Sequence, residues 1–230
     1  MSSWRDNAKK RVAVEAVKNI QSGDIVGLGS GSTAAFAIRE IGKRVQNEGL
    51  TIKGVATSSE AERIALAEGI KLTSLDILEQ LDVAIDGADQ VDNELNLIKG
   101  LGGALTREKI VDDLAKRLII IVDETKLSDR LGGNIPVPVE VLPFALNPVT
   151  RRLKDMGGRP VLRLCEDGET MVTDNHNYIL DTYFESIENP EELRKKLKLI
   201  PGVIENGLFI DMTDKLYVGC KKGIKIMERM

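Results

Sequence analysis

The sequence predicts an α/β fold, in which a parallel sheet domain carries a smaller inserted α+β domain of antiparallel strands. Short apolar runs alternate with helical patterns from residue 25 to residue 123, as in parallel strands joined by right-handed helical crossovers. Glycines and prolines gather at residues 129–150, and the strand-like runs beyond them are separated by turns. We therefore expect a Rossmann-like sheet domain over residues 1–128 and 206–230, and an α+β domain over residues 129–205.

The first elements follow from the spacing of apolar residues. Residues 8–20 carry apolar side chains at helical spacing, and Gly23 follows as a stop signal. Residues 25–28, Ile-Val-Gly-Leu, form a short apolar run that predicts a buried strand. This run leads through a glycine- and serine-rich turn into the helical pattern of residues 34–45.

The alternation of strands and helices continues to residue 123. Further helices are expected at residues 60–69 and 104–117, and a helical turn after residue 73. The expected strands lie at residues 52–56, 71–73, 82–85 and 118–123. The last of these is the strongest, because Leu-Ile-Ile-Ile-Val-Asp is almost wholly aliphatic. A long polar loop separates the strand at 82–85 from the helix that begins near residue 104.

The inserted domain is expected to combine two helices with three strands. The helices are predicted at residues 148–157 and 190–200, and the strands at residues 160–164, 170–174 and 178–183. Two further strand-like runs, at residues 207–212 and 215–220, are expected to return to the sheet domain.

Composition excludes several classes of function. The chain has 230 residues, a net charge of −4 and 3% aromatic residues, which argues against a basic, aromatic nucleic-acid surface. The longest aliphatic run, Leu118–Val122, is far shorter than the ~20 residues that span a bilayer. The polar N-terminus lacks the apolar region of a secretory signal.

Cysteine and histidine are too sparse for a metal cluster. Cys165 and Cys220 lie far apart and belong to no metal-binding motif, so we expect a reducing, cytoplasmic setting. The single histidine, His176, stands between two strand-like runs and is interpreted as a turn residue.

A first chemical motif is Gly-Leu-Gly-Ser-Gly-Ser-Thr at residues 27–33, between a predicted strand and a predicted helix. Backbone N–H groups at a helix start attract anions, and the hydroxyls of Ser30, Ser32 and Thr33 suit a phosphate. An ordinary helix cap would use the same residue types. The motif alone therefore leaves both interpretations open.

Two familiar phosphate-binding loops do not fit this motif. A dinucleotide fingerprint requires a glycine where Ser32 stands, and an acidic residue where the next strand ends in Thr57-Ser58-Ser59. Glu48 has about the right sequence distance but precedes that strand. A Walker A loop fails because no Gly-Lys-Ser/Thr follows.

A second motif, Asp-Gly-Ala-Asp-Gln-Val-Asp at residues 86–92, directly follows a predicted strand. Ligands bind at the carboxyl ends of parallel strands, where Asp86 and Asp89 could accept hydrogen bonds from sugar hydroxyls or transfer a proton. An Asx turn, or a Mg²⁺ or Ca²⁺ site, would use the same carboxylates, although EF-hand spacing is absent.

A third motif spans residues 99–110, Lys-Gly-Leu-Gly-Gly-Ala-Leu-Thr-Arg-Glu-Lys-Ile. Glu108 lies near a helix N-terminus, where the helix dipole stabilises a carboxylate. The functional alternative makes Glu108 a proton carrier and Lys99 the cation that stabilises a developing oxyanion. Lys126 follows the strand at 118–123, either as a solvated surface residue or at the ligand-binding edge.

Taken in this order along the chain, these segments resemble the ribose-5-phosphate isomerases of the A type. The motifs at residues 27–33, 86–92 and 99–109, the Ser58-Ser59 pair and Val-Asp-Glu-Thr-Lys at residues 122–126 carry the resemblance. Pro-Val-Glu-Val-Leu-Pro-Phe-Ala, Gly-Gly-Arg-Pro, Val-Thr-Asp-Asn and Ile-Pro-Gly-Val-Ile-Glu-Asn-Gly-Leu-Phe extend it over nearly the whole chain. Gln90 and Leu101 depart from it, since Glu and Gly are frequent at these positions, and Leu101 bears on how freely its loop bends.

The resemblance implies an aldose–ketose isomerase of the non-oxidative pentose phosphate pathway. Such an enzyme interconverts D-ribose 5-phosphate and D-ribulose 5-phosphate through an enediolate, with neither metal nor cofactor. The implied catalytic residues are Glu108, which transfers the proton, and Asp86, Asp89 and Lys99 around the sugar oxygens. The implied substrate-binding residues are Lys9, Ser30, Gly31, Ser32, Thr33, Asp86, Gly87, Ala88, Asp89, Lys99, Gly100, Leu101, Gly102 and Lys126.

The resemblance also bears on partners. It implies a sugar phosphate as ligand and a cytoplasmic homodimer or homotetramer, with no nucleic-acid or membrane partner.

Two alternatives from other classes share an α/β scaffold of this kind. One is a sugar-phosphate-sensing effector domain, and the other is an acyl-transfer or sugar-amine deaminase enzyme. Incubation with ribose 5-phosphate, followed by an assay for ketose, separates these three possibilities.

Overall fold

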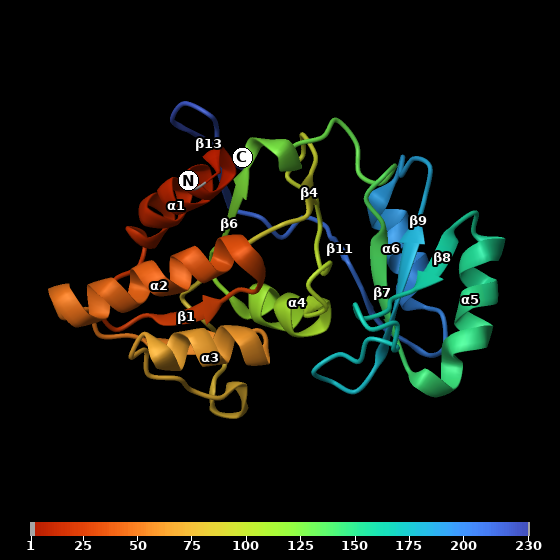
Figure 1. Cartoon of the computed structure of the whole chain (residues 1–230), viewed down its shortest axis with the longest axis horizontal. Helices are drawn as coiled ribbons and strands as arrows, with labels where there is room; N and C mark the ends of the chain where they lie inside the picture. The colour runs from red at the N-terminus through yellow and green to blue at the C-terminus, as the bar shows by residue number, and fades with distance from the viewer. Residues whose placement is uncertain (1–2, 230) are drawn as a thin grey trace. The chain divides into compact units, whose positions relative to one another are not determined.

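The computed structural model describes residues 3–229 and divides the chain into two compact units (Figure 1). The first unit comprises the residues up to Ala88, Arg107–Lys126 and the residues from Met212 onward. The second unit comprises Asp89–Thr106 and Leu127–Asp211. The predicted domain limits placed residues 89–106 with the sheet domain, whereas their strands pair with a strand near residue 208 in the second unit.

The first unit is built on a six-stranded sheet in the order β13-β12-β6-β3-β1-β2. Five neighbouring strands run parallel, and the edge strand β13 pairs antiparallel with β12. The strands are β1 (Ile25–Leu28), β2 (Lys53–Ala56), β3 (Val83–Asp86), β6 (Leu118–Asp123), β12 (Lys215–Gly219) and β13 (Ile224–Glu228). The parallel α/β prediction is therefore confirmed, although β13 was not predicted.

Helices cover both faces of this sheet. Helices α1 (Trp4–Val17), α2 (Gly31–Glu48) and α3 (Ser59–Ala67) share one apolar core with Val26 and Leu28 of β1. Helix α4 (Leu105–Leu114) packs on the other face, where an ideal Cβ atom on Gly27 would lie 2.7 Å from Val111 Cγ1. The β1 side chains thus alternate between the two faces, as a strand of period two requires.

Local capping explains where two of these helices begin and end. The Ser3 hydroxyl accepts a hydrogen bond from the Asp6 N–H, and the Asp6 carboxylate accepts one from the Ser3 N–H, so α1 begins at Trp4 rather than near residue 8. Helix α2 ends at Glu48, and the next residue, Gly49, has a φ of 71° in the left-handed region that glycine tolerates.

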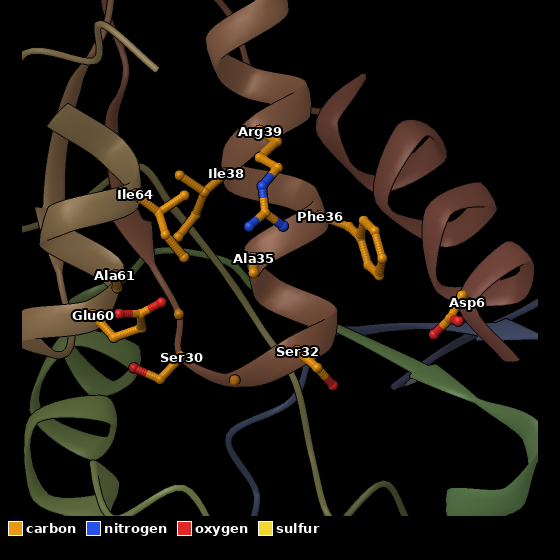
Figure 2. A pocket seen from close by; sticks show the side chains of 12 residues that line it. Asp6, Ser30, Ser32, Ala35, Phe36, Ile38, Arg39, Glu60, Ala61 and Ile64 are labelled. Carbon is orange, nitrogen blue, oxygen red and sulfur yellow. The ribbon is translucent and has the colours of Figure 1, made fainter. Parts of the chain in front are cut away.

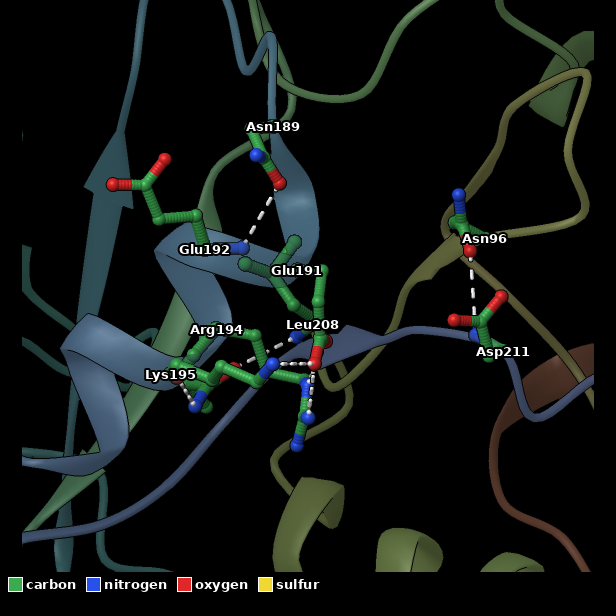
Figure 3. Close-up of polar contacts among 9 residues, drawn as sticks. Asn96, Asn189, Glu191, Glu192, Arg194, Lys195, Leu208 and Asp211 are labelled. Carbon is green, nitrogen blue, oxygen red and sulfur yellow. Dashed lines mark hydrogen bonds and ion pairs between the residues drawn. The ribbon is translucent and has the colours of Figure 1, made fainter.

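The second unit contains a four-stranded antiparallel sheet in the order β10-β7-β9-β8. Its elements are β7 (Val137–Val141), β8 (Arg159–Leu162), β9 (Tyr178–Tyr183), β10 (Val203–Asn206), α5 (Leu146–Asp155) and α6 (Pro190–Lys198). Asn189 caps α6 by accepting a 3.0 Å hydrogen bond from the Glu192 N–H, and Glu191 pairs with Arg194 and Lys195 along the helix (Figure 3). The predicted inserted α+β unit of antiparallel strands is confirmed.

The second unit also holds a three-stranded sheet in the order β11-β5-β4. Its strands are β4 (Gln90–Val91), β5 (Leu97–Ile98) and β11 (Leu208–Phe209), and they pair antiparallel. Two predictions are corrected here. Residues 86–103 are not a continuous loop, and the run at 207–212 pairs with β5 instead of returning to the six-stranded sheet.

Two further strand predictions are wrong, and the first has a local cause. Residues 170–174 form only an isolated bridge from Thr170 to Leu164, because the Thr173 hydroxyl turns the chain by accepting the Asn175 and Asn177 N–H groups. The expected strand at 71–73 is reduced to a bridge between Leu72 and Gly54.

Within residues 3–229, no helix combines the length and apolar character needed to cross a membrane.

The predicted helical turn after residue 73 is present as η1 (Leu75–Ile77). Two more single turns, η2 (Glu124–Lys126) and η3 (Pro143–Ala145), follow β6 and β7.

Candidate active site

The parallel strands of the first unit bring three predicted segments to one edge of the sheet. β6, β3 and β1 are neighbours, so Gly29–Thr33 after β1, Asp86–Ala88 after β3 and η2 after β6 all lie at their carboxyl ends. The chain leaves β1 toward β2 on one side and β3 lies on the other, which makes this edge a topological switch point. Such points are where open α/β sheets bind ligands.

Gly87 lies between these segments. An ideal Cβ atom at Gly87 would be 3.9 Å from each of three atoms: the Ile121 carbonyl oxygen, the Ser30 carbonyl oxygen and Thr33 Cβ. The structure therefore brings the ends of β1, β3 and β6 together around a residue without a side chain. The sequence had placed Gly87 in the site only through the resemblance.

Asp86 ties two of the segments to each other. Its side chain is fully buried, and Oδ1 accepts hydrogen bonds from the N–H groups of Ser30 (3.0 Å) and Gly87 (2.6 Å). An ideal Cβ atom on Gly29 would lie 2.2 Å from the same oxygen, so only glycine allows this approach. Asp86 thereby fixes the loop that begins α2.

The hydroxyl groups of the loop have different surroundings. Ser30 Oγ lies 2.7 Å from both Thr57 Oγ1 and Ser58 Oγ, so it links the loop to the start of α3. Ser32 is exposed and its Oγ accepts a 2.9 Å hydrogen bond from Lys9 Nζ of α1. Lys9 and Ser32 thus form a polar, positively charged pair at the N-terminus of an 18-residue helix, where an anion is stabilised.

A pocket of about 400 Å³ opens beside this loop in the first unit (Figure 2). Its lining combines the loop with side chains of α1, α2 and α3: Asp6, Gly29, Ser30, Gly31, Ser32, Ala35, Phe36, Ile38, Arg39, Glu60, Ala61 and Ile64. Sequence reasoning missed Phe36, Arg39 and Glu60. Ser32, Phe36 and Arg39 follow one another at intervals of four and three, so they share a helix face, and that spacing was available as a signal.

Charges of both signs border the pocket. The Arg63 guanidinium hydrogen-bonds to Glu60 and holds the pKa of that carboxyl below its usual range, and the charge of Arg39 acts in the same direction. Glu60 therefore stays ionised on the α3 side, while Arg39 contributes a cation on the α2 side. Both Ser30 and Ser32 lie at the lower end of the pocket as drawn in Figure 2.

Glu108 and Lys126 complete the predicted residues of the first unit. Glu108 lies in the first turn of α4 and is only 5% exposed, which is unusual for a carboxylate. Asp112, one turn further along the same helix, is also buried. Lys126 ends η2 and is partly exposed at the carboxyl end of β6.

The second unit holds the remaining predicted residues around a tight loop. Lys99 follows β5, is 2% exposed, and places Nζ 5.2 Å from the centroid of the Phe209 ring, within cation–π range. Its N–H donates to the Gly207 carbonyl at 2.9 Å. Asp89 Oδ2 accepts a 2.9 Å hydrogen bond from the Leu101 N–H, so Asp89 and the Gly100–Gly102 segment are brought together.

The lone histidine and the metal-ligating residue types complete the description. His176 is an exposed residue in a turn, with φ of 62°, which confirms the turn interpretation. Among residues 3–229, no group of three or more His, Cys, Asp or Glu side chains is arranged to hold a metal ion.

Comparison with known proteins points in one direction. The family model described as ribose 5-phosphate isomerase A (phosphoriboisomerase A) matches residues 53–223. A ribose-5-phosphate isomerase A of Thermosynechococcus vestitus is 52% identical over 214 residues, covering 92% of this chain and 90% of that protein. One of Methanothermobacter thermautotrophicus is 49% identical over 223 residues, covering 96% and 97%.

Solved structures agree with these sequence relatives. The structure of ribose 5-phosphate isomerase A from Methanocaldococcus jannaschii superposes with a TM-score of 0.93 at 46% identity, covering 96% of this chain and 98% of that one. A D-ribose-5-phosphate isomerase in complex with phospho-erythronic acid gives a TM-score of 0.96 at 42% identity over the whole of both chains.

Proposed function

The chain belongs to the ribose 5-phosphate isomerase A family, and we propose that Glu108 moves the proton as the enzyme interconverts D-ribose 5-phosphate and D-ribulose 5-phosphate. The observation that carries the assignment is the burial of Glu108 in the first turn of α4, directly after the glycine-rich segment. A desolvated carboxylate beside substrate is a competent base for a proton next to a carbonyl.

The reaction needs no group besides a base and a set of hydrogen-bond donors. In the open-chain aldose, Glu108 removes the proton from C2, and the electrons of that C–H bond form a C1–C2 double bond while O1 becomes negative. A proton then passes from O2 to O1, Glu108 returns its proton to C1, and C2 becomes the ketone carbon. The intermediate is an enediolate, whose charge must be stabilised in place.

Lys99 is the proposed cation for that charge. A lysine with an exposed fraction of 2% is rare, since a buried ammonium group needs partners that compensate for its lost hydration. Asp86 and Asp89 are proposed to order the backbone around the sugar, since each accepts hydrogen bonds from loop N–H groups. Gly87, Ala88, Gly100, Leu101 and Gly102 are proposed to contact the sugar along these ordered segments.

The phosphate is proposed to bind at the start of α2. The N-terminus of a long helix, the exposed Ser32 hydroxyl and the Lys9 ammonium supply the donors and positive charge that a phosphate dianion requires. Gly31 and Thr33 belong to the same turn, and Lys126, half-exposed after β6, is proposed as a further contact. Binding energy at this remote group would position the reacting carbons.

We also propose that the enzyme works in the cytoplasm as a homodimer or homotetramer. Cys165 and Cys220 are free thiols, in keeping with a reducing compartment. The exposed large apolar side chains of the second unit include Phe144 (100%), Leu199 (81%) and Leu142 (44%), which favours association between copies. Light scattering after size exclusion measures the mass, and a monomer at micromolar concentration would contradict this part of the proposal.

A direct assay tests the function itself. The protein is incubated with ribose 5-phosphate, and formation of ribulose 5-phosphate is followed by ¹³C NMR. The proposal predicts approach to the aldose–ketose equilibrium from both directions without added reagents. A ligand-sensing domain would bind without turnover, whereas a deaminase or acyl-transfer enzyme would leave the sugar phosphate unchanged.

A further inference from the structure

One arginine of the second unit hydrogen-bonds to the glycine-rich loop that follows Lys99. Arg163 lies directly after β8, and its Nη1 atom donates hydrogen bonds of 3.0 Å to the carbonyl oxygens of both Gly100 and Leu101. Neither the resemblance nor the motifs in the sequence draw attention to Arg163. The hydrogen bond between Arg163 and Gly100 joins residues that are 63 positions apart in the sequence.

Arg163 is itself held in place by a carboxylate. Its Nε donates to Asp181 Oδ2 at 2.8 Å, and its Nη2 makes a second, short hydrogen bond to Asp181 Oδ1. The two side chains are 11% and 17% exposed, so the pair is shielded from most solvent. A bidentate pair of this kind fixes the plane of the guanidinium, which lysine cannot reproduce.

The loop is held from its other side as well. The Leu101 N–H donates to Asp89, and the Gly103 N–H donates to the Gly100 carbonyl at 3.0 Å. In a trans peptide the N–H points away from the C=O. Because Arg163 holds the Leu101 carbonyl, the N–H of the exposed Gly102 is turned to the side opposite the guanidinium.

We propose that Arg163 is a positioning residue for the isomerisation: it orients the Gly100–Gly102 peptides so that the loop next to Lys99 presents the Gly102 N–H to the sugar oxygens. This inference rests on the proposed function, in which that loop binds substrate. Asp181 acts through Arg163 by fixing its guanidinium. The antiparallel sheet of the second unit thereby takes part in ordering the site.

The test compares substitutions at two arginines near the ends of β8. Arg163→Lys keeps a positive charge but cannot bridge two carbonyls while pairing twice with Asp181. Arg159→Lys is the matched control, because Arg159 begins the same strand and stacks on Tyr183, 4.4 Å from the ring centroid, instead of touching the loop. Both proteins are assayed with ribose 5-phosphate, and their thermal midpoints are measured.

We expect Arg163→Lys to lower kcat/KM by about 10- to 100-fold, with kcat affected as well as KM. A loss of this size is typical when the groups that bind the reacting atoms are misplaced. Its thermal midpoint should match that of Arg159→Lys, whose kinetics should equal those of the wild type. In Arg163→Ala, millimolar guanidinium should restore part of the activity in a saturable manner, and it should not change Arg159→Ala.

Two results would overturn the inference. One is an Arg163→Lys enzyme with kcat/KM within about twofold of wild type. The other is a loss of activity that follows a fall in thermal midpoint and resists guanidinium, which indicates a purely structural role. Wild-type turnover of ribose 5-phosphate is measured in the same experiment, so a failure of the proposed function is recognised separately as an inactive wild-type enzyme.

Discussion

The Asp86 carboxylate accepts a 3.0 Å hydrogen bond from the backbone N–H of Ser30, so the residue that ends β3 holds the residue that directly precedes α2. The two residues are 56 positions apart in sequence. This contact joins the two sides of the switch point and sets the shape of the loop proposed to bind phosphate. It makes the loop's geometry sensitive to a side chain outside the loop.

Removing the charge of Asp86 should therefore impair the site more than it impairs the fold. A hydrogen bond to a charged group contributes about 1.5–3 kcal/mol, and we expect Asp86→Asn to lower kcat/KM by about 10- to 100-fold. The matched control is Asp82→Asn, because Asp82 precedes the same strand and accepts the Ile25 N–H at 2.9 Å at the opposite end of the sheet. Equal kinetic losses in both variants would contradict this prediction.

Asp82 should also make the stability of the fold depend on pH, with lower stability in acid. The hydrogen bond from the Ile25 N–H and the contact with Lys116 hold the pKa of the Asp82 carboxyl below its usual range. A lowered pKa in the folded state stabilises the fold above the ordinary pKa of about 4, and this stability is lost as pH falls through the folded-state pKa. Asp82→Asn should melt a few degrees below wild type at pH 7, and the gap should narrow below pH 4. A gap that is constant with pH would show that the charge contributes nothing.

The phosphate should matter more than the sugar for binding. Unphosphorylated ribose should be a very poor substrate, because remote binding energy positions the reacting carbons. Lys9→Met and Thr33→Ala should raise KM for ribose 5-phosphate and change kcat less. Lys18→Met is the control, since Lys18 lies at the other end of α1 and pairs with Glu15. Similar kcat/KM values for ribose and its phosphate would refute the assignment.

Activity should not depend on a metal ion. The proposed proton transfer uses a carboxylate base and the Lys99 ammonium, and both are supplied by the chain itself. Turnover should survive dialysis against EDTA at the wild-type rate. Complete loss that a divalent ion restores would instead make Asp86 and Asp89 candidate ligands.

The fold was predictable wherever a single strong pattern covered a whole element. The aliphatic run of β6 and the apolar spacing of α1 each identify their element from local sequence. β7 was not predicted, although it is buried along its full length. Proline is uncommon inside a strand, and Pro136 and Pro138 therefore argue against one in this segment. β4 and β5 have two residues each, too short to show a period.

The site was predictable only as a set of separate segments. The motifs pointed to these residues because Asp86 follows a predicted strand, while Lys99 precedes and Glu108 follows a glycine-rich turn. The contacts between segments, such as Lys9 with Ser32 or Arg163 with Gly100, depend on how distant parts of the chain pack. An arginine bound to two carbonyls has no local sequence signal, so Arg163 could be found only in three dimensions.

Glu108 is proposed to move the proton between C2 and C1. Glu108→Gln keeps the size and polarity of the side chain but removes the base. Asp112→Asn is the control, because it removes a second buried carboxylate one turn further along the same helix. If Glu108 merely stabilised the N-terminus of α4, its substitution would cost only about 0.3–1 kcal/mol of stability and leave turnover near normal.

The most direct measurement is exchange of the substrate's C2 proton with solvent deuterium, followed by ¹H NMR together with kcat and the thermal midpoint. We predict that Glu108→Gln lowers kcat by about 10²–10⁴-fold, leaves KM nearly unchanged and abolishes the exchange, whereas Asp112→Asn retains it. A Glu108→Gln enzyme that still exchanges the C2 proton, with turnover within about threefold of wild type, would contradict the assignment of Glu108 as the base and move that role to Asp86 or Asp89.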